Sequence, residues 1–574
     1  MKPNKRKPRR AHSAGHPARR PDRKPEDVGT QAATGSGTVR ELGFVIAIWL
    51  VLGIAMSLLA AQNLSVPGLY YDEAVFAGTA KDFLTSNTHG THMPGFQAVE
   101  FSGRPFPFFV QSYLGALKSW LLIPSFQFFG QTVAVLRASN LFWGIVSLLF
   151  FMLATWRWLG LRMALIAGPI LAVDPAYFFL SIIDWGVAVP SFLCRCVSFF
   201  FAVIWWQNRR AAYIFLAAFF AGLGFFNKID FAVLLIAVTG AGVLCFGRGL
   251  WRNLTMRPSA AAFAVTGFLL GSGAMLLKIP GILSGQMSGA NPSQPGELTE
   301  KVNTIVALYD GSYFYRLMDT GGMFEKMYSE PVGWLPVFGF LTLVGIVVCL
   351  MQGGRKASDP NNARIGRFLV AAIALATLGI ILLPGAVRIH HAVLVYPLPH
   401  LTIAFAAGLF LQRLQSQKTF AVRMATWAIL LGLFAAEIHA IYRTQALVRE
   451  TGGRGRWSEA FDRFCQENKS RNDLAIVSLD WGFNEQLNFL TDGPQLSEPF
   501  WGMRGPFPGF GPNSPALPVD PKYVYLVHPA EYSLFPFGEH YLKQARAADP
   551  EVQIHPYSDR QNRVAFYTIQ FPRR

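Results

Sequence analysis

The stretch Gly68-Leu69-Tyr70-Tyr71-Asp72-Glu73-Ala74-Val75-Phe76-Ala77 follows the first long apolar run of the chain, Leu42–Ala61. It places two adjacent carboxylates close to the end of a segment long enough to cross a hydrocarbon core of about 30 Å. Neighbouring side chains on a helix point about 100° apart, so Asp72 and Glu73 cannot face the same way. One can face a cavity while the other caps the helix start, although capping alone would also explain the pair.

Composition identifies a polytopic, all-α membrane protein. Of 574 residues, 52% are hydrophobic and only 15% are charged, against about 25% charged in a soluble domain. The net charge of +17 raises the question of nucleic acid, but residues 1–42 alone hold eleven Lys/Arg and four Asp/Glu. That segment is typical of a disordered basic tail. Because no basic-aromatic platform is present, we expect no nucleic-acid partner.

Eleven segments are predicted to span the membrane: 43–61, 131–153, 161–181, 187–206, 211–227, 230–246, 258–279, 333–352, 367–384, 391–412 and 420–442. Segment 105–130 is also apolar, but it contains Gln111, Lys118 and Pro124. If it does not cross, all the basic loop clusters between spans lie on one side, with the N-terminus, as the positive-inside rule expects. If it crosses, these clusters face outward. We therefore expect 105–130 to lie along, or dip into, the outer leaflet.

This threading places the chain in the inner cell membrane with a cytoplasmic N-terminus. The first outer loop (62–130, with juxtamembrane helices), the long outer loop (280–331) and residues 444–574 then face outward, and the membrane domain covers 43–443. In the C-terminal part, alternating apolar runs predict strands at 474–479, 523–527 and 564–569, and 458–468 has a helical pattern. We expect a small extracytoplasmic α/β domain there.

Several ionisable residues fall at outer span ends under this threading. Lys228 sits in a very short turn where an outward lysine is disfavoured, so it needs an anionic partner, either Asp230 or a bound phosphate. Arg388 suits phosphate through bidentate hydrogen bonds. His390 and His391, which follow it, could transfer protons or simply pack. The mid-span Arg195 is expected to be functional or ion-paired, with Asp174 or Asp184 as its partner.

The order of these motifs resembles the GT-C glycosyltransferases, and within them the branch of protein O-mannosyltransferases and of the aminoarabinose transferases that modify lipid A. The matching stretches lie between residues 43 and 412: Tyr71–Ala77, Val135-Leu136-Arg137-Ala138-Ser139, Asp184, Gly222–Lys228, and Arg388 with Tyr396-Pro397-Leu398-Pro399. The resemblance implies that Asp72, with Glu73 beside it, is the catalytic acid pair and Asp72 the base. It further implies that Lys228 and Arg388 bind phosphate and that Asp184 shapes the acceptor site.

The sequence also departs from that branch. Aminoarabinose transferases carry a second first-loop acid just before Lys-Pro, where this chain has Ser102-Gly103-Arg104-Pro105 with Glu100 slightly earlier. Glu100 and Arg104 are therefore candidate substrate-binding residues without an established counterpart. The His-Pro-Pro motif of the eukaryotic enzymes is missing, and the sequence of the C-terminal domain carries no motif that identifies a domain family.

The leading hypothesis is an inverting membrane glycosyltransferase that uses a polyprenyl-phosphate sugar and a protein, lipid or glycan acceptor. A carboxylate would take the proton of the attacking hydroxyl, and cations would stabilise the phosphate leaving group. The sequence indicates no definite cofactor; a divalent cation is one possibility, and its ligands are unknown. A transporter or flippase of a phosphorylated lipid is the alternative, and an inactive scaffold is a third reading. Two matched halves with broken spans, typical of many transporters, are not evident.

Overall fold

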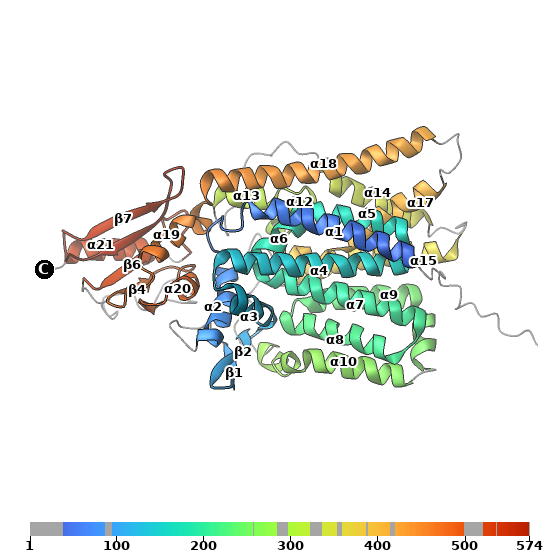
Figure 1. Cartoon of the computed structure of the whole chain (residues 1–574), viewed down its shortest axis with the longest axis horizontal. Helices are drawn as coiled ribbons and strands as arrows, with labels where there is room; N and C mark the ends of the chain where they lie inside the picture. Colours follow the sequence, from blue (N-terminus) through green and yellow to red (C-terminus); the bar gives the residue numbers. More distant parts are fainter. Residues whose placement is uncertain are drawn as a thin grey trace, which may run out of the picture. The chain divides into compact units, whose positions relative to one another are not determined.

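A bundle of apolar helices is followed by a C-terminal domain built on a mixed sheet (Figure 1). This computed structural model describes residues 38–85, 95–255, 258–283, 297–321, 336–352, 359–385, 388–413, 420–498, 521–534 and 537–572. Most of the predicted basic tail, residues 1–37, therefore lies outside the described residues. The prediction was wrong for residues 39–42, because they form the first turn of α1: Thr38 accepts from Glu41 N, and Glu41 accepts from Thr38 N. This reciprocal capping box starts the helix there.

All eleven predicted spans coincide with helices. These are α1 (Val39–Ala61), α4 (Val133–Leu159), α5 (Leu161–Val173) with α6 (Pro175–Ile183), α7 (Ala188–Asn208), α8 (Ala211–Asn227), α9 (Phe231–Thr255), α10 (Pro258–Leu276), α14 (Val337–Gln352), α15 (Pro360–Leu382), α17 (Leu398–Arg413) and α18 (Phe420–Thr451). Among the described residues, seven helices are long and apolar enough to cross a membrane, and the α5–α6 pair would make an eighth. Helix α8, the apolar part of α9 and helix α14 are shorter.

The single span predicted over 161–181 is in fact two helices bent by 60°. The break falls at Asp174-Pro175, where Asp174 is extended and accepts a hydrogen bond from Tyr177 N at 2.9 Å. Proline disfavours helical backbone in the residue before it but suits the first turn of a helix. The Tyr396 hydroxyl donates to the same carboxylate at 3.0 Å and holds the buried break in place.

Segment 105–130 forms no helix long enough to cross a hydrocarbon core, and it contains strands as well as the helix expected in this loop. It contains β2 (Arg104–Gln111), β3 (Leu114–Gly115) and α3 (Leu117–Phe129), and β2 pairs with the exposed strand β1 (Gln97–Phe101) in an antiparallel hairpin. The 13 residues of α3 reach only about 20 Å at 1.5 Å per residue. Helix α2 (Tyr71–Thr85) precedes the hairpin and packs on α3.

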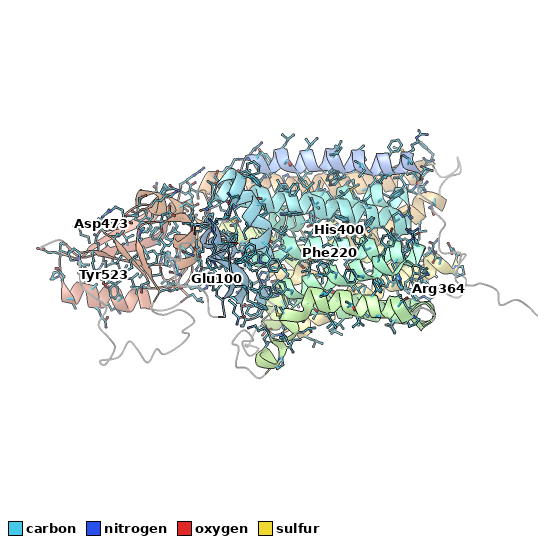
Figure 2. The ribbon with its side chains drawn as sticks, turned by 60° about the horizontal axis from the view of Figure 1, so that its bottom comes forward. Glu100, Phe220, Arg364, His400, Asp473 and Tyr523 are labelled. Carbon is cyan, nitrogen blue, oxygen red and sulfur yellow. The ribbon has the colours of Figure 1, made fainter. Side chains whose placement is uncertain are left out.

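Shorter helices fill the other loops at the span ends. They are α11 (Ile279–Leu283), α12 (Glu297–Tyr309) and α13 (Tyr313–Thr320) in the predicted long outer loop, η1 (Trp185–Val187) after α6, and α16 (Ile389–Ala392) with η2 (Val393–Val395) before α17. Arg364, predicted to lie inside, is at the end of the bundle opposite to Glu100, predicted to lie outside (Figure 2). Which end faces the cytoplasm stays a prediction.

The predicted C-terminal strands and helix are confirmed as β4 (Ala475–Ser478), β6 (Tyr523–Val527), β8 (Val564–Gln570) and α19 (Glu459–Glu467). With β5 (Gln495–Ser497) and β7 (Gln553–Ser558) they form a sheet of order β5-β4-β6-β8-β7, parallel in its first three strands and antiparallel afterwards. The domain also contains η4 (Gly455–Trp457), α20 (Asn484–Leu490) and α21 (Phe537–Ala548). Helix α18 ends at Thr451, beyond the predicted span end at residue 442, and leads directly into the C-terminal domain.

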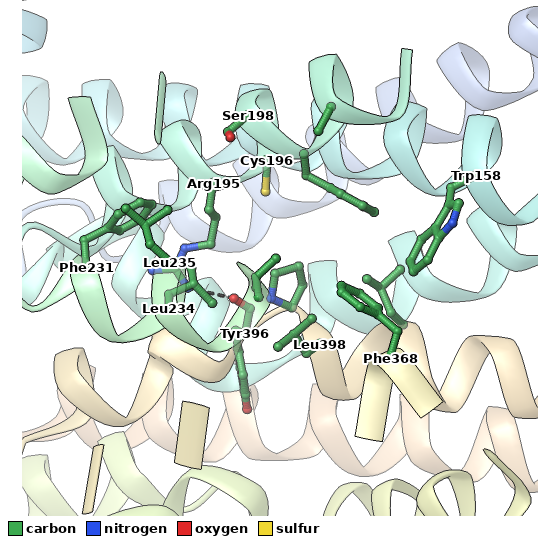
Figure 3. Close-up of a pocket in the computed structure, with 15 residues that line it drawn as sticks. Trp158, Arg195, Cys196, Ser198, Phe231, Leu234, Leu235, Phe368, Tyr396 and Leu398 are labelled. Carbon is green, nitrogen blue, oxygen red and sulfur yellow. Dashed lines mark hydrogen bonds between the residues drawn. The ribbon is translucent and has the colours of Figure 1, made fainter. Parts of the chain in front are cut away.

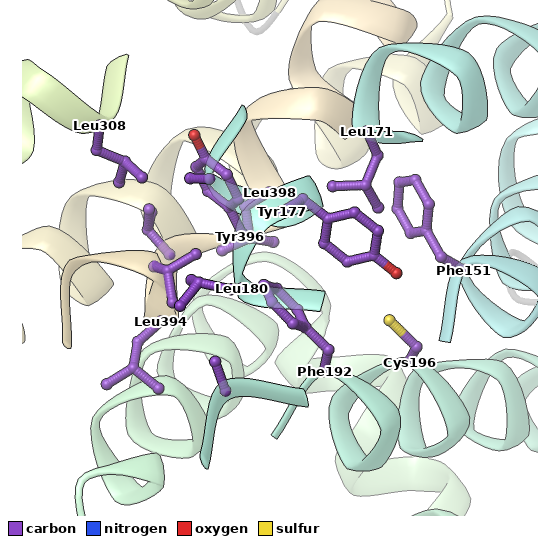
Figure 4. Packing of buried hydrophobic residues seen from close by; sticks show 14 of the residues in the cluster. Phe151, Leu171, Tyr177, Leu180, Phe192, Cys196, Leu308, Leu394, Tyr396 and Leu398 are labelled. Atoms are coloured by element: carbon purple, nitrogen blue, oxygen red, sulfur yellow. The ribbon is translucent and has the colours of Figure 1, made fainter. Parts of the chain in front are cut away.

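The membrane core contains buried polar groups that are satisfied inside the bundle. In Figure 4 the Tyr177 ring lies among Phe151, Phe192 and Cys196, and its hydroxyl donates to the Gly144 carbonyl at 2.7 Å. Arg195 was expected to pair with Asp174 or Asp184, and that expectation was wrong. Its guanidinium instead donates to the carbonyls of Val393 at 3.0 Å and Tyr396 at 2.7 Å, next to the break between η2 and α17.

Helices α8 and α10 lie side by side (Figure 1) and approach closely at glycines. A Cβ atom on Gly267 would overlap the Phe215 carbonyl oxygen, and one on Gly271 would overlap the Phe219 carbonyl oxygen. Small residues four apart let two membrane helices bring their backbones together. Since α8 ends at Asn227, this contact also places Lys228.

We predict that Gly271→Leu forces α8 and α10 apart and destabilises the protein by about 1–3 kcal/mol, the usual cost of overpacking. Gly273→Leu is the matched control, because no described atom lies within 4 Å of a Cβ there. The thermal unfolding midpoint of the purified protein in detergent should fall in the first variant only. Equal midpoints in the two variants would contradict the close contact.

Candidate active site

Glu73 and Asp72 divide their roles at the start of α2, as helix periodicity predicted. Glu73 is completely buried, and its carboxylate accepts from Arg137 Nε at 3.0 Å and from Arg137 Nη2 at 2.9 Å. Its Oε2 atom also accepts from the backbone N–H of Tyr70 at 3.2 Å. Glu73 therefore caps the helix, while Asp72 points elsewhere.

Arg137 of α4 fixes the loop that leads into α2. Besides Glu73, the guanidinium donates to the carbonyls of Pro67 at 2.7 Å and Gly68 at 3.1 Å. The side chain is 0% exposed, so it gives up hydration entirely in exchange for these partners. A planar guanidinium suits such a task because its donors are fixed in a fork. Arg137, which belongs to the Val135–Ser139 motif, thus connects that motif to the acidic pair Asp72-Glu73.

Asp72 is partly buried and lies among other charged groups. Burial raises the pKa of its carboxyl to about 6, although Lys228 and Lys118 nearby act to lower it. Trp185 also favours the charged form as a nearby donor, but its indole nitrogen has no hydrogen bond of standard geometry with the described residues. Asp72 makes no ion pair within the described part of the chain. A carboxyl with a pKa near 6 can accept a proton at neutral pH.

Asp184 is held by Lys118, a residue that the sequence marked only as an interruption of an apolar segment. Lys118 Nζ lies 3.1 Å from Asp184 Oδ2 and donates to the Asp184 carbonyl at 3.2 Å. Both side chains are buried, and the other carboxylate oxygen accepts from Val189 N at 2.7 Å. An ionisable residue at membrane depth is a functional candidate by default, and this signal could have found Lys118.

Lys228 has the partner that its position required. Its Nζ lies 3.0 Å from Asp230 Oδ2, and the same oxygen lies 2.8 Å from Nδ1 of His391. Lys228 and His391 thus both contact the Asp230 carboxylate and favour its charged form. Asp230 therefore stays ionised and fixes Lys228 beside the other groups. The lysine remains within electrostatic reach of Asp72.

Arg388, the residue before α16, and His390, within α16, lie near the same group of residues. The charge of Arg388 is close enough to Tyr70 and Tyr313 to act to lower the pKa of both hydroxyls. The charge of Asp72 acts to raise the pKa of Tyr70. The His390 ring lies 5.5 Å from the Trp185 ring. A Cβ on Gly186 would overlap the His390 ring, so this position, with φ of +64°, requires glycine.

Glu100 and Arg104 do not join this group. Both side chains are exposed on the β1–β2 hairpin, and Arg104 donates to the Leu84 carbonyl at 3.3 Å. Neither contributes to the charges that act on Asp72. The six residues that the structure brings together are Asp72, Asp184, Lys228, Arg388, His390 and His391.

The described residues contain no group of three or more His, Cys, Asp or Glu side chains arranged to hold a metal ion. The acids near the site have basic partners instead: Glu73 with Arg137, Asp184 with Lys118, and Asp230 with Lys228. These three carboxylates are thus each neutralised by a basic side chain.

An apolar cavity of about 160 Å³ lies inside the bundle behind the site (Figure 3). Arg195, Tyr396 and Phe231 line it where the chain leaves Asp230, and Trp158 and Phe368 line it further along. The other lining side chains are almost all apolar, including Leu234, Leu235 and Leu401. Such an apolar lining suits part of a hydrocarbon chain.

Comparison with known proteins identifies the fold. No protein-family profile and no curated protein sequence matches the chain. The crystal structure of ArnT from Cupriavidus metallidurans in the apo state aligns with a TM-score of 0.51 at 12% identity, covering 92% of this chain and 97% of that chain. ArnT bound to undecaprenyl phosphate gives 0.49 at 13% identity over the same shares. The Archaeoglobus fulgidus oligosaccharyltransferase tethered with an acceptor peptide gives 0.48 at 13%, over 80% of this chain and 64% of that chain.

The similarity to apo ArnT extends over nearly the whole of both chains and is one of architecture, since few residues are shared. The chain therefore has the GT-C fold with a C-terminal domain of mixed sheet and helices, as its motifs predicted. With its several apolar helices, it is a membrane protein.

We predict that Glu73→Gln destabilises the protein by about 3–5 kcal/mol, because it leaves the buried Arg137 guanidinium without its counter-charge. The matched control is Asp473→Asn, which removes a carboxylate from an exposed pair with Arg471 and should cost less than about 1 kcal/mol. Chemical unfolding of the purified protein in detergent measures both. A loss in Glu73→Gln no larger than in the control would mean that the pair is not the anchor of α2.

Proposed function

We propose that the chain is an integral-membrane glycosyltransferase that moves a sugar from a polyprenyl-phosphate donor to an acceptor hydroxyl on the extracytoplasmic face. The observation that carries the proposal is Asp72: its pKa is near 6, and it lies among Lys118, Lys228 and Asp184 without an ion pair of its own in the described structure. The fold shared with ArnT, an aminoarabinose lipid A transferase, supports a transferase of lipid-linked sugars.

The reaction is a single displacement at the anomeric carbon. The acceptor oxygen forms a bond to that carbon while the bond from the carbon to the phosphate oxygen breaks, and polyprenyl phosphate leaves with the bonding electron pair. The proton of the acceptor hydroxyl passes to Asp72. Because the nucleophile and the leaving group occupy opposite faces of the carbon, the configuration inverts.

The cations hold the phosphate and stabilise the charge that it gains. Lys228 is fixed for this task by Asp230, which in turn is bound by His391, and Arg388 offers a planar fork for phosphate oxygens. Asp184, held by Lys118, orients the acceptor. His390 supports this arrangement by packing on Trp185. We assign no role in the phosphate site to Glu100 or Arg104, because both lie on the exposed hairpin.

The apolar cavity suits the donor's isoprenoid tail. It begins beside Arg195 and Phe231, next to Asp230, and continues toward Trp158 at the far end of α4. A donor with its phosphate at Lys228 would thus find apolar walls on the membrane side. The site faces outward under the Lys/Arg bias of the loops, with the membrane domain over 43–443 and the C-terminal domain over 444–574.

A transporter or flippase of a phosphorylated lipid is the competing function, because it would use the same cations. It would form no bond to a sugar, so it would not require Asp72 to take the proton of an acceptor hydroxyl. The two functions therefore differ in what they require of Asp72.

We predict that Asp72→Asn lowers turnover at least about a hundredfold, the lower range for loss of a general base. Purified protein in nanodiscs is given a panel of undecaprenyl-phosphate sugars with a mixed acceptor pool, and release of undecaprenyl phosphate is measured. Asp82→Asn, the same change later on α2, is the control for folding and should retain activity. Undecaprenyl phosphate binding without turnover in the wild type would favour the transporter.

The pH dependence follows from the same residue. The base must be deprotonated, and burial raises the pKa of Asp72 to about 6. Activity should therefore rise as the pH increases through about 6 and level off above it, in a plot of kcat/KM against pH. A limb near pH 4 would show that the acting carboxyl is fully hydrated, and Asp72 would lose the proposed role.

Filling the cavity should weaken binding of long-chain donors. Ala202 lines it, and Ala202→Phe should raise the Kd for undecaprenyl phosphate about tenfold, since overpacking a filled cavity costs about 1–3 kcal/mol. Geranyl phosphate, whose tail is far shorter, should bind as before. Ile236→Phe, at a position 72% exposed on α9, is the control. A tenfold loss with both lipids would place the effect at the phosphate site.

A further inference from the structure

The C-terminal domain forms hydrogen bonds with the segment just before Asp72, the proposed base. The backbone N–H of Gly68 donates to the Trp457 carbonyl at 2.7 Å, and that of Leu69 donates to the Asp462 carboxylate at 3.2 Å. A Cβ on Gly68 would overlap the Ser458 carbonyl oxygen, so the two segments can approach this closely only with glycine there. The backbone N–H groups of Gly68 and Leu69 are thus both hydrogen-bonded to the C-terminal domain.

An aromatic stack continues this contact up to Asp72. The Tyr70 and Trp457 rings stack with centroids 3.8 Å apart and 5° between their planes. Trp185 meets Tyr70 edge-on at 5.5 Å, and Trp481 lies 4.2 Å from Tyr71. Tyr70, Trp457 and Trp185 are each 0% exposed. Two stacked rings of this kind restrict the orientation of the backbone that bears them.

Trp457 is itself held rigidly. It ends the short helix η4, where its N–H donates to the Arg454 carbonyl at 2.9 Å. Arg454 binds Asp319 at 2.8 Å and Gln561 at 2.7 Å, and Arg456 donates to the Tyr532 carbonyl. The loop before α19 is therefore anchored to α13 of the membrane domain and to the C-terminal domain.

The other end of α2 is bound to the same domain. Lys81 Nζ donates to the carbonyls of Asn488, Phe489 and Thr491 at 3.1, 3.0 and 2.8 Å. These carbonyls end α20, where a cation is favoured. Figure 1 shows α2 next to α20. Helix α2 is thus fixed at both ends by the C-terminal domain and in between by Arg137.

We propose that Trp457 and Asp462 are positioning residues that act through Gly68–Tyr71 to place Asp72, so that the C-terminal domain is a structural part of the active site. This inference rests on the proposed function for its catalytic consequence, while the placement itself is a property of the fold. A base that must lie within hydrogen-bonding distance of the acceptor hydroxyl loses rate when it is displaced by about 1 Å.

The test compares Trp457→Ala, Trp457→Phe and Tyr525→Ala in the full-length protein. Trp457→Ala removes the stack and should lower kcat at least tenfold, with the Kd for undecaprenyl phosphate unchanged. It should also move the limb of the pH profile below 6, because water then reaches Asp72. Trp457→Phe keeps a stacking ring and should stay within about threefold of wild type. The Trp457 indole nitrogen has no hydrogen-bond partner in the described residues, so that change removes no hydrogen bond.

Tyr525→Ala is the matched control, because Tyr525 is fully buried in the C-terminal sheet and packs on Tyr541 at 4.7 Å. It should lower thermal stability without changing kcat or the pH limb. If Trp457→Ala changes kcat and the pH limb no more than this control, the proposal is wrong. Should Trp457→Ala not be recovered folded, Asp462→Ala takes its place with the same expected results.

Hydrogen exchange separates this proposal from the proposed function. The amides of residues 69–76 should exchange faster in Trp457→Ala than in the wild type or in Tyr525→Ala, with no substrate present. Faster exchange in Trp457→Ala, combined with a wild type that never releases undecaprenyl phosphate, would refute the glycosyltransferase and leave the placement of α2 standing. Unchanged exchange would overturn the placement, whatever the activity.

Discussion

The buried ion pair between Arg137 and Glu73 is the constraint on which the site depends. Both side chains are 0% exposed, so each charge has lost its hydration at a cost of several kcal/mol. That cost is offset only because the guanidinium also binds carbonyls of the loop before α2 and the carboxylate also accepts a backbone N–H. The pair thus fixes the loop, the start of α2 and, one residue earlier, the direction in which Asp72 points.

The same electrostatic rule explains the rest of the site. In a medium of low dielectric constant a buried charge needs a partner, and Asp184 has Lys118 while Asp230 has Lys228 and His391. Asp72 differs from these acids because cations lie near it without making an ion pair, and burial therefore dominates and raises its pKa to about 6. In the described structure, the ion-paired groups keep their charges and can bind a substrate, whereas Asp72, which has no ion pair, can accept a proton.

The site is assembled from the ends of many elements rather than from one motif. Helix α2, the end of α6, the α8–α9 turn and the segment before α17 supply its polar groups, and the glycine contact of α8 with α10 and the break at Asp174-Pro175 set where these ends lie. The C-terminal domain closes the arrangement through Trp457 and Lys81. Stability and catalysis are therefore linked, since contacts that hold the helices together also place the reacting groups.

The sequence by itself determined the eleven apolar segments, the strands β4, β6 and β8, and the divergence of Asp72 from Glu73. Length, hydrophobicity and periodicity are properties of single segments, so each of these could be read locally. The sequence also indicated that Lys228 needs an anionic partner, because an outward lysine is disfavoured in so short a turn, and it offered Asp230 two residues away. The tertiary structure alone decided that Lys118 holds Asp184, that Arg195 binds carbonyls, that Glu100 and Arg104 lie on an exposed hairpin, and that Trp457 stacks on Tyr70. Tertiary contacts of this kind join residues far apart in the sequence: Leu69 and Asp462 are 393 positions apart, and Lys81 and Thr491 are 410 apart. No local pattern encodes which distant side chain will fill a buried space, because that choice follows from the packing of all the helices at once.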